Sequence, residues 1–336
     1  MTNMENLPPR DSIPPENHPV RTRRYTIITP MMDKQIGEFV GWVRNGVPSG
    51  MIPGDPRIGK TKLRRTAALE LPKFYPGIVI VSMIARGYVV PSERVFFGDL
   101  LRAIRHKMCT EGTAAQRRDR LTQRIVQMVR SSGQGRAVLL IDQAHKLQEL
   151  HYEWLIDFHD EISEQGVELF VFLFGQKELT AISDEFRRTG KTQIIGRFMV
   201  DRLDYHGIRS LAEMKACLEA YDEHAKYPED TDWTYTRYFF PDAYARGWRL
   251  AQHAKTFFKA FEEVRAYSPG PGRLEIPMQN FVRTVERFLL EAQVTKANEP
   301  VLSQAQIIEY VLSTAFGAAP QAGDNDEDNN EEEPMT

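Results

Sequence analysis

Eight residues near the start of the chain could bind a phosphate group. Positions 54–61 read Gly-Asp-Pro-Arg-Ile-Gly-Lys-Thr and match the pattern G-x-x-x-x-G-K-S/T. The two glycines let the backbone approach phosphate oxygens, and the N–H groups at a helix start favour an anion. The lysine can reach the β- and γ-phosphates, and the threonine hydroxyl can ligate Mg²⁺. The pattern predicts an ATP site formed by Gly54, Asp55, Pro56, Arg57, Ile58, Gly59, Lys60, Thr61 and Lys62.

A carboxylate that could hold a metal ion follows the third apolar run of the chain. Residues 137–141 (AVLLI) predict a strand, and Asp142 comes directly after it. A carboxylate at such a strand end can bind Mg²⁺ directly or through water. The alternative is an ordinary strand that ends in a polar turn. Together with the phosphate-binding pattern, Asp142 and Thr61 predict a pair of Mg²⁺ ligands.

A polar side chain follows the fourth apolar run as well. Residues 168–174 (ELFVFLF) predict a strand, and Gly175 and Gln176 come after it. The carboxyl ends of neighbouring parallel strands meet at one edge of a sheet, where ligands bind in open α/β folds. Gln176 is therefore placed to lie beside a γ-phosphate and to orient an attacking water molecule.

The elements that must position these side chains alternate between strand and helix. Continuous apolar runs, such as GIVIVSM at 77–83, are typical of parallel strands that are covered on both faces. This alternation predicts an α/β fold of three layers with a five-stranded, mostly parallel sheet. The predicted strands are 47–52, 77–83, 137–141, 168–174 and 198–205, and the predicted helices are 31–44, 60–74, 91–109, 113–130, 150–165 and 180–188.

The second part of the chain predicts helices and no strand. The candidates are 211–224, 242–266, 279–293 and 303–316, and the aromatic-rich stretch 233–240 is expected to pack in a core. The predicted organisation is a disordered proline-rich arm (1–20), an α/β core (21–207), a helical lid with C-terminal helices (208–317) and a disordered acidic tail (318–336).

Charge is unevenly distributed along the chain. The net charge is −3, but seven carboxylates lie in the acidic tail, which leaves the remainder mildly basic. The tail is expected to solubilise the chain, with a docking peptide or nucleic-acid mimic as the alternative. Cys109 and Cys217 are isolated, so no disulfide framework is indicated. No apolar run approaches the length of a membrane span. We therefore expect a cytoplasmic protein with no membrane partner.

These motifs resemble those of AAA+ ATPases: a Walker A loop, a Walker B strand, a polar end to the fourth strand and a helical lid. The segment Ile141-Asp-Gln-Ala-His-Lys146 resembles the Walker B sequence of the TnsC, TniB and ExeA group. Phe174-Gly-Gln-Lys-Glu-Leu179 is similar to their G-Q-x-E-L segment, and residues 194–200 resemble their arginine-containing approach to the fifth strand. The layout over roughly residues 20–315 most resembles TnsC proteins of CRISPR-associated transposons.

The resemblance implies a function. TnsC proteins bind ATP and Mg²⁺, assemble as rings of six or seven subunits or as helical filaments around double-stranded DNA, and connect a TniQ-type target-selection protein with a TnsA/TnsB-type transposase. A neighbouring subunit supplies an arginine to each ATP, because a cation must meet the γ-phosphate charge. Arg197 is the first candidate and Arg188 the second. Arg246 or Arg249 would be the second sensor of the lid. For all four, a surface or structural role is the alternative.

One position departs from the family pattern. The family has glutamate after the Walker B aspartate, where it polarises the attacking water, but this chain has Gln143. An amide cannot accept a proton as a carboxylate does, so ATP binding should survive while hydrolysis becomes weak. The predicted catalytic residues are therefore Lys60, Asp142, Gln143, Gln176, Arg197 and Arg188.

The predicted DNA contacts rest on charge alone. Arg86, Arg94 and Lys146 follow the second and third strands, where the related proteins commonly face DNA, and they could grip the phosphate backbone without reading its sequence. One alternative function is a nucleotide-locked scaffold with little hydrolysis, which Gln143 favours. Another is a secretion ATPase related to ExeA, which the lack of a membrane segment disfavours. A P-loop kinase of small molecules explains the motifs least well.

Overall fold

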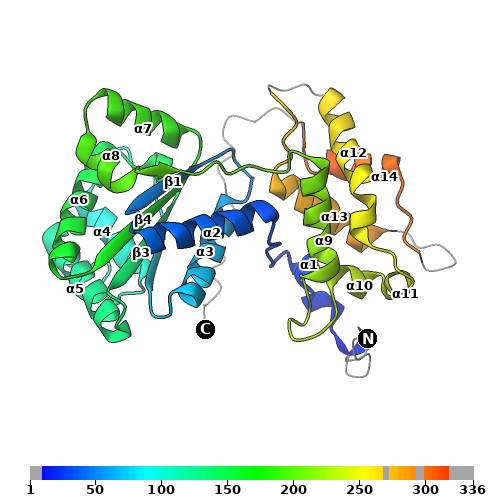
Figure 1. The fold of residues 1–336 in the computed structure, drawn as a ribbon, viewed down its shortest axis with the longest axis horizontal. Coiled ribbons are helices and arrows are strands. Elements are labelled where there is room, and N and C mark those ends of the chain that lie inside the picture. Colours follow the sequence, from blue (N-terminus) through cyan, green and yellow to red (C-terminus); the bar gives the residue numbers. More distant parts are fainter. Residues whose placement is uncertain (1–9, 268–271, 293–298, 318–336) are drawn as a thin grey trace. The chain divides into compact units, whose positions relative to one another are not determined.

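The computed structural model describes residues 10–267, 272–292 and 299–317, and these form two compact units (Figure 1). The α/β unit comprises residues 31–55 and 59–205. The helical unit comprises residues 10–30 and 56–58 and the described residues from 206 onward. The α/β unit thus ends at Tyr205, and residues 21–30 belong to the helical unit. No helix in the described ranges is both long and apolar enough for a membrane span.

A five-stranded, all-parallel sheet runs through the α/β unit, which confirms the predicted fold class. Its strands are β1 (Ser49–Pro53), β2 (Val79–Ile84), β3 (Arg136–Asp142), β4 (Glu168–Gly175) and β5 (Asp201–Arg202). The strand order is β2-β3-β4-β1-β5. The strand β4 is therefore flanked by β3 and β1, and the three chain segments that leave their carboxyl ends lie next to one another.

Helices cover both faces of this sheet. Alternate residues of β4 point to opposite sides: Leu169, Val171 and Leu173 join one hydrophobic core with the helices α4 (Glu93–Ala103), α5 (Ala114–Ser132) and α6 (Glu149–Glu164). On the other face, the ring of Phe172 lies 5.2 Å from that of Phe39 and 5.0 Å from that of Trp42. The helices of this unit are α2 (Pro30–Asn45), α3 (Lys60–Phe74), α4 (Glu93–Ala103), α5 (Ala114–Ser132), α6 (Glu149–Glu164), α7 (Glu178–Arg188) and α8 (Thr192–Phe198).

The prediction of the fifth strand is wrong in extent. Residues 198–205 were expected to be extended, but Phe198 ends α8, where it is buried on the same helix face as Ile194. Only Asp201 and Arg202 pair with β1. Arg197 consequently lies within a helix and not on an extended approach to a strand. The helix predicted over 91–109 is also shorter, because α4 ends at Ala103.

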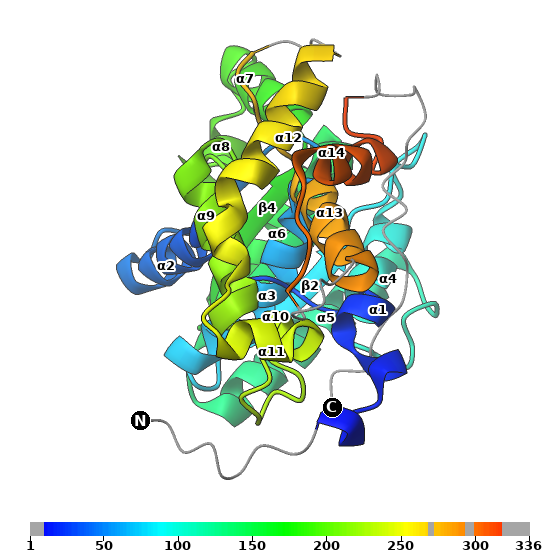
Figure 2. The same cartoon turned by 90° about the vertical axis from the view of Figure 1, so that its right-hand side faces the viewer.

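The helical unit packs its helices around a second hydrophobic core, in which α14 (Gln304–Ser313) lies against both α12 (Ala254–Tyr267) and α13 (Met278–Glu291) (Figure 2). Tyr235 and Tyr238 are 4% and 2% exposed, which confirms the predicted burial of the aromatic stretch. The predicted helix 242–266 is broken at Gly247, whose φ is 93°. The helices are α9 (Leu211–Glu223), α10 (Tyr235–Phe239), α11 (Pro241–Ala245), the 3-10 helix η5 (Leu250–His253), α12 (Ala254–Tyr267), α13 (Met278–Glu291) and α14 (Gln304–Ser313).

The proline-rich segment is not an extended arm where the structure describes it. Residues 10–22 form two 3-10 helices, η2 (Arg10–Ser12) and η3 (Pro15–Asn17), and the short helix α1 (Pro19–Thr22). Ile13, His18 and Val20 are buried against the helical unit, which explains the ordered backbone. Residues 1–9 of the predicted arm and the predicted acidic tail at 318–336 lie outside the described residues.

Candidate nucleotide site

The phosphate-binding pattern forms a loop between β1 and α3, as the sequence predicts. Gly59 has a φ of 98°, a left-handed conformation that suits glycine, and the chain enters α3 at Lys60 without a side-chain cap on the helix. The N-terminus of α3, where a helix favours an anion, therefore has no side-chain cap from Gly59. Ile58 is completely buried and Arg57 is exposed with a φ of 63°; together with Pro56 they count among the residues of the helical unit.

The side chain of Lys60 folds over its own loop. Its Nζ donates hydrogen bonds to the carbonyl of Gly54 at 2.9 Å and to that of Asp55 at 2.6 Å. The ammonium group is thus held beside the start of α3, where the backbone dipole also favours an anion. The Asp55 carboxylate in turn accepts from Lys177 Nζ at 2.6 Å, which ties the loop to the segment after β4. Lys62 is half-buried on the first turn of α3.

The structure brings Thr61 and Asp142 together. The Thr61 hydroxyl donates to Asp142 Oδ2 at 2.8 Å, although 81 positions separate the two residues. The Asp142 side chain is buried, with 4% of its surface exposed, and its Oδ2 also accepts from Arg64 Nε at 3.2 Å. The Arg64 guanidinium donates to the Ser82 hydroxyl as well. A hydroxyl and a carboxylate this close can share one hard cation such as Mg²⁺.

The sequence motifs do not include Arg64, and only its position relative to the phosphate loop points to the site. Arg64 lies four positions after Lys60 and three after Thr61, so it shares a helix face with the two phosphate-loop residues. Its side chain is 7% exposed, and burial lowers the pKa of the guanidinium, while Asp142 acts in the opposite direction. Arg64 therefore balances the charge of the buried Asp142 carboxylate within the α/β unit.

Gln143 continues from Asp142 in a tight turn. Its φ is 53°, its backbone N–H donates to Asp142 Oδ1 at 2.8 Å, and its side-chain oxygen accepts from Lys146 Nζ. This side chain is an amide, so it has no carboxylate with which to accept a proton from water. Gln176 is half-buried and follows the last residue of β4, at the same edge of the sheet.

The two arginines proposed as trans-acting groups are paired within their own chain. Arg197, on α8, donates to both carboxylate oxygens of Asp160, at 2.9 and 3.0 Å. Arg188, at the end of α7, donates to Glu185 at 2.6 Å and its side chain is 71% exposed. An exposed pair one helical turn apart contributes little stability, so Arg188 can exchange its partner more readily than Arg197.

The two candidate sensor arginines lie in the helical unit and differ in their contacts. Arg249 donates to the carbonyls of Tyr244 and Trp248, both at 2.8 Å, and its guanidinium lies 3.5 Å from the centre of the Tyr244 ring. Arg246 is exposed and lies 3.6 Å from the carboxylate of Glu299. Arg249 thus supports the local fold of its own unit, whereas Arg246 points to a surface carboxylate.

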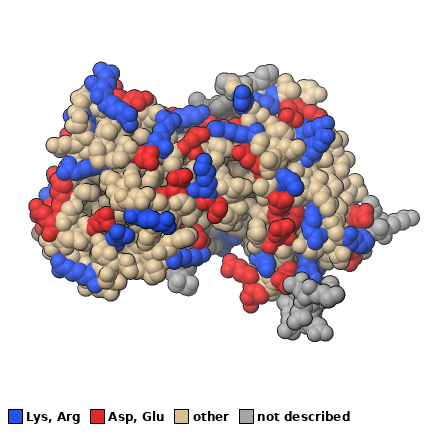
Figure 3. Space-filling view, in the orientation of Figure 1, with Lys and Arg blue, Asp and Glu red and all other residues tan. Residues whose placement is uncertain are grey.

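The three candidate DNA contacts are exposed on the α/β unit. Arg86 follows β2, Arg94 lies on the first turn of α4 and donates to Gly112 O at 3.0 Å, and Lys146 binds Gln143. The loop between Arg86 and Arg94 carries Val89, which is 99% exposed. On the face drawn in Figure 3, basic and acidic residues interleave over each unit, so that face presents no field of a single sign.

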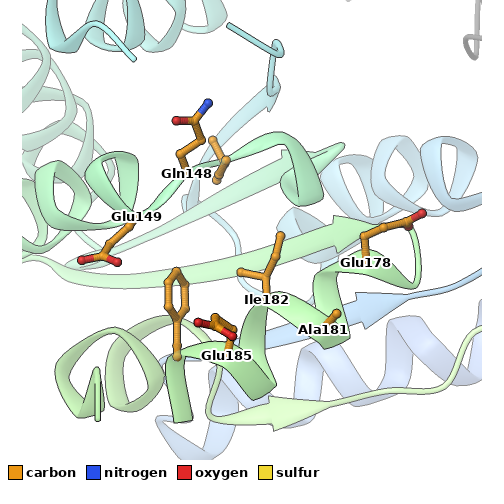
Figure 4. Close-up of a pocket in the computed structure, with 8 residues that line it drawn as sticks. Gln148, Glu149, Glu178, Ala181, Ile182 and Glu185 are labelled. Atoms are coloured by element: carbon orange, nitrogen blue, oxygen red, sulfur yellow. The ribbon is translucent and has the colours of Figure 1, made fainter. Parts of the chain in front are cut away.

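A groove of about 410 Å³ lies beside the site, between the start of α6 and α7 (Figure 4). Its floor is apolar, with Leu147, Ile182 and Phe186 among its lining residues. Its rim carries Glu149 and Glu185, which pair with Lys191 and Arg188, respectively, at 2.5 and 2.6 Å. Glu178, on the first turn of α7, brings a third carboxylate to this rim.

The residues gathered at the carboxyl edge of the sheet fit a nucleoside triphosphate with Mg²⁺. The uncapped start of α3 and Lys60 suit phosphate oxygens, and the pair formed by Thr61 and Asp142 suits a hard cation. The sequence predicted these positions because each is fixed by a loop or by a strand end.

Comparisons with known proteins give one family match and several structural likenesses. The family described as "AAA domain" matches residues 44–182, which contain the phosphate loop, Asp142 and Gln176. No curated protein matches. Among solved structures, Aeropyrum pernix ORC2 in its ADP form is 13% identical, with a TM-score of 0.45 over 93% of this chain and 87% of that one. Cdc6p from Pyrobaculum aerophilum is 15% identical, with a TM-score of 0.40 over 85% of each chain.

Proposed function

We propose that this chain is an ATP-dependent AAA+ transposition regulator. It assembles as a ring or filament on double-stranded DNA and links target-site selection to a transposase. The observation that carries the proposal is the hydrogen bond between Thr61 and Asp142, because it joins the Walker A hydroxyl to the Walker B carboxylate across the sheet edge. The match of residues 44–182 to an AAA domain supports the ATPase part. The resemblance of Ile141–Lys146 and Phe174–Leu179 to the TnsC group supports the transposition part.

The residues of this chain divide the work on ATP. The loop 54–62 holds the phosphates through its N–H groups and Lys60, and Thr61 and Asp142 hold Mg²⁺, which neutralises phosphate charge. Gln176 orients the attacking water from the end of β4. Gln143 stands at the position of the general base but its amide cannot take the proton, so turnover is slow. Arg188, with its replaceable partner Glu185, is the better placed of the two finger candidates.

In this proposal, assembly on DNA uses a few exposed basic side chains, and each ATP is shared between two neighbouring subunits. Arg86 and Lys146 are exposed on segments that leave β2 and β3, and they contact the DNA backbone together with Arg94. Such contacts release counterions, so affinity falls steeply with salt and varies little with sequence. The partners are further copies of this chain, a TniQ-type protein and a TnsA/TnsB-type transposase. Arg246 is the favoured sensor over Arg249, whose guanidinium is held by two backbone carbonyls.

Gln143 favours a second candidate function: a nucleotide-locked scaffold that binds ATP and assembles on DNA with almost no hydrolysis. Its amide oxygen is held by Lys146, so the side chain is fixed in a turn where it cannot act as a base. An ExeA-like secretion ATPase is a weaker alternative, since no specific observation in the structure favours it.

One set of variants tests both functions. Lys60→Ala removes a charge-assisted contact with phosphate and should weaken binding of a fluorescent ATP analogue roughly 10- to 100-fold. Lys73→Ala, at the exposed end of the same helix, is the matched control and should bind normally. Gln143→Glu restores a base and should raise ATP turnover about 100-fold.

Electron microscopy of the same proteins with ATP and duplex DNA measures assembly. A regulator forms rings or filaments with the wild-type chain and sheds them as Gln143→Glu hydrolyses ATP. If Lys60→Ala binds ATP and assembles as the wild type does, the proposed function is wrong. If the wild type and Gln143→Glu assemble equally and neither hydrolyses ATP, the scaffold replaces the regulator.

A further inference from the structure

One peptide group at the end of β4 has both of its polar atoms engaged by the two nucleotide motifs. The carbonyl of Gly175 accepts a hydrogen bond from the N–H of Gly54 at 3.1 Å. The next N–H, that of Gln176, donates to His145 Nδ1 at 3.2 Å. In a trans peptide the C=O and N–H point in opposite directions. The Gly175–Gln176 peptide therefore bridges the phosphate loop on one side and the turn after Asp142 on the other.

The order of the strands explains why a histidine is needed there. On the side of β1, the pairing continues to the last residue of β4, where Pro53 opposes Gly175. On the side of β3, the last pair is Ile141 with Leu173, because the chain then turns at Gln143. The N–H of Gln176 would otherwise lack a strand partner at this edge. The ring nitrogen of His145 takes the place of the carbonyl that β3 no longer supplies.

The surroundings of this bridge are closely packed. A Cβ at position 175 would lie 3.0 Å from Leu179 Cδ2 and 3.3 Å from the backbone nitrogen of His145, so glycine allows the two segments to approach. His145 is half-buried, and burial lowers the pKa of its ring. Lys146 and Lys60 also lower that pKa, whereas Glu178 on the groove rim and Asp142 raise it. A ring that accepts at Nδ1 is neutral and carries its proton on Nε2.

We propose that His145 is a positioning residue that couples the Walker B turn to the phosphate loop through the Gly175–Gln176 peptide. Fixing this peptide fixes the direction in which the Gln176 side chain leaves the end of β4. A change in the turn after Asp142 is passed to Gln176 and, through Gly175, to Gly54. The coupling makes the site distinguish a nucleotide with a γ-phosphate from one without it. This inference rests on the proposed function, since it requires that the loop bind nucleotide.

Three substitutions separate the hydrogen bond from the bulk of the ring. His145→Asn places its side-chain oxygen near the position of Nδ1 and keeps the acceptor. His145→Gln carries its acceptor one bond further along the chain, and His145→Ala has none. The affinities for ATP and for ADP, each with Mg²⁺, are measured for these proteins and the wild type. We expect ADP affinity to stay within about twofold, while the preference for ATP falls roughly tenfold in the alanine and glutamine variants.

Recovery in His145→Asn is the decisive result, because a role in packing alone would not be restored by a smaller side chain. If His145→Ala keeps the wild-type preference for ATP, or if the asparagine variant is as impaired as alanine, the inference is overturned while nucleotide binding stands. If the wild-type chain binds neither nucleotide, the proposed function fails and the inference fails with it. Hydrogen exchange of β4 and α7 confirms that each variant is folded.

Discussion

Among the described residues, each unit of the molecule buries one aspartate, and the two are satisfied in different ways. Asp142 of the α/β unit is 3% exposed and Asp222 of the helical unit is 1% exposed. Asp142 Oδ2 accepts from two side chains, the Thr61 hydroxyl and the Arg64 guanidinium, and only its Oδ1 accepts from a backbone N–H, that of Gln143. The partners of Asp222 are backbone N–H groups, those of Leu250 at 3.0 Å and Ala251 at 2.9 Å.

This difference is consistent with the proposed role of Asp142 in metal binding and with a structural role of Asp222. Side chains can rotate, so the Thr61 hydroxyl can break its hydrogen bond with Asp142 Oδ2. The Thr61 hydroxyl oxygen and Asp142 Oδ2 can then both bind a cation. Backbone N–H groups at the start of η5 are fixed by the fold, so Asp222 can only cap that helix. Burial raises the pKa of Asp222, and the N–H of Ala251, the Thr236 side chain, the N–H of Leu250 and the charge of Arg249 oppose that rise only in part. Burial of a carboxylate therefore does not mark a site unless its partners are exchangeable.

The largest expected effect is that of Asp142→Ala. The change leaves the Arg64 guanidinium buried without its carboxylate, which typically costs about 3–5 kcal/mol of the free energy of unfolding. Asp142→Asn keeps an acceptor for Arg64 and should cost less, yet it should abolish the dependence of ATP binding on Mg²⁺. Denaturant unfolding and Mg²⁺ titrations of nucleotide binding measure the two effects.

The double variant Asp142→Ala with Arg64→Met supplies the control, because it removes both buried charges. It should be more stable than Asp142→Ala alone. If Asp142→Ala were as stable as the wild type, the Arg64 guanidinium would not depend on the Asp142 carboxylate. The contrast between the partners of Asp142 and those of Asp222 would then be wrong.

A somewhat smaller effect is expected for Asp222→Ala. Two buried N–H groups lose their acceptor, at about 1–3 kcal/mol each, but the cost of burying the Asp222 carboxylate is relieved, so the helical unit should lose roughly 2–4 kcal/mol. Hydrogen exchange should rise in α9, η5 and α12 and not in the sheet. ATP affinity of the folded protein should stay unchanged. A loss of nucleotide binding without faster exchange in these helices would contradict the structural role of Asp222.

The same contrast explains how far the sequence alone could be interpreted. Four strands were predicted within one or two residues at most of their ends, because long apolar runs bounded by glycine, proline or charge have few alternatives. The fifth strand was predicted too long at both ends, because Phe198 packs as the last residue of α8 and only Asp201 and Arg202 pair with β1. Sequence patterns carry no information on which of two periods tertiary packing will select.

The residues of the candidate site also differ in whether the sequence could predict them. Lys60, Thr61 and Asp142 could be predicted, since their places are set by a loop pattern and a strand end. Arg64 and His145 could not be assigned roles, because their partners come from other strands and depend on side-chain direction. Asp222 and His18 carry no motif, and their burial follows from contacts with residues far along the chain.

The smallest predicted effect is the pH dependence of stability. It distinguishes the two units because His18 belongs to the helical unit. Its ring is completely buried, stacks on Tyr238 at 4.4 Å, and accepts from Val20 N–H at 3.2 Å through Nδ1. Burial, and to a smaller extent Arg21, lowers the pKa of His18 from 6.5 to about 3. Between pH 6.5 and 3 the unfolded chain binds a proton at His18 that the folded unit does not bind. The free energy of unfolding therefore has its full value above pH 6.5 and falls as the pH drops toward 3.

At pH 5 this linkage costs the helical unit roughly 2 kcal/mol relative to pH 7. His18→Phe keeps a ring against Tyr238 but removes the titrating group, so it should lower stability by about 1 kcal/mol at pH 7 and flatten the pH dependence. Hydrogen exchange at the two pH values, corrected for intrinsic rates, measures each unit separately. The pKa of His253 in the same unit is also lowered by burial, so part of the dependence should remain. An unchanged pH dependence in His18→Phe would show that His18 is not the group whose protonation opens the helical unit.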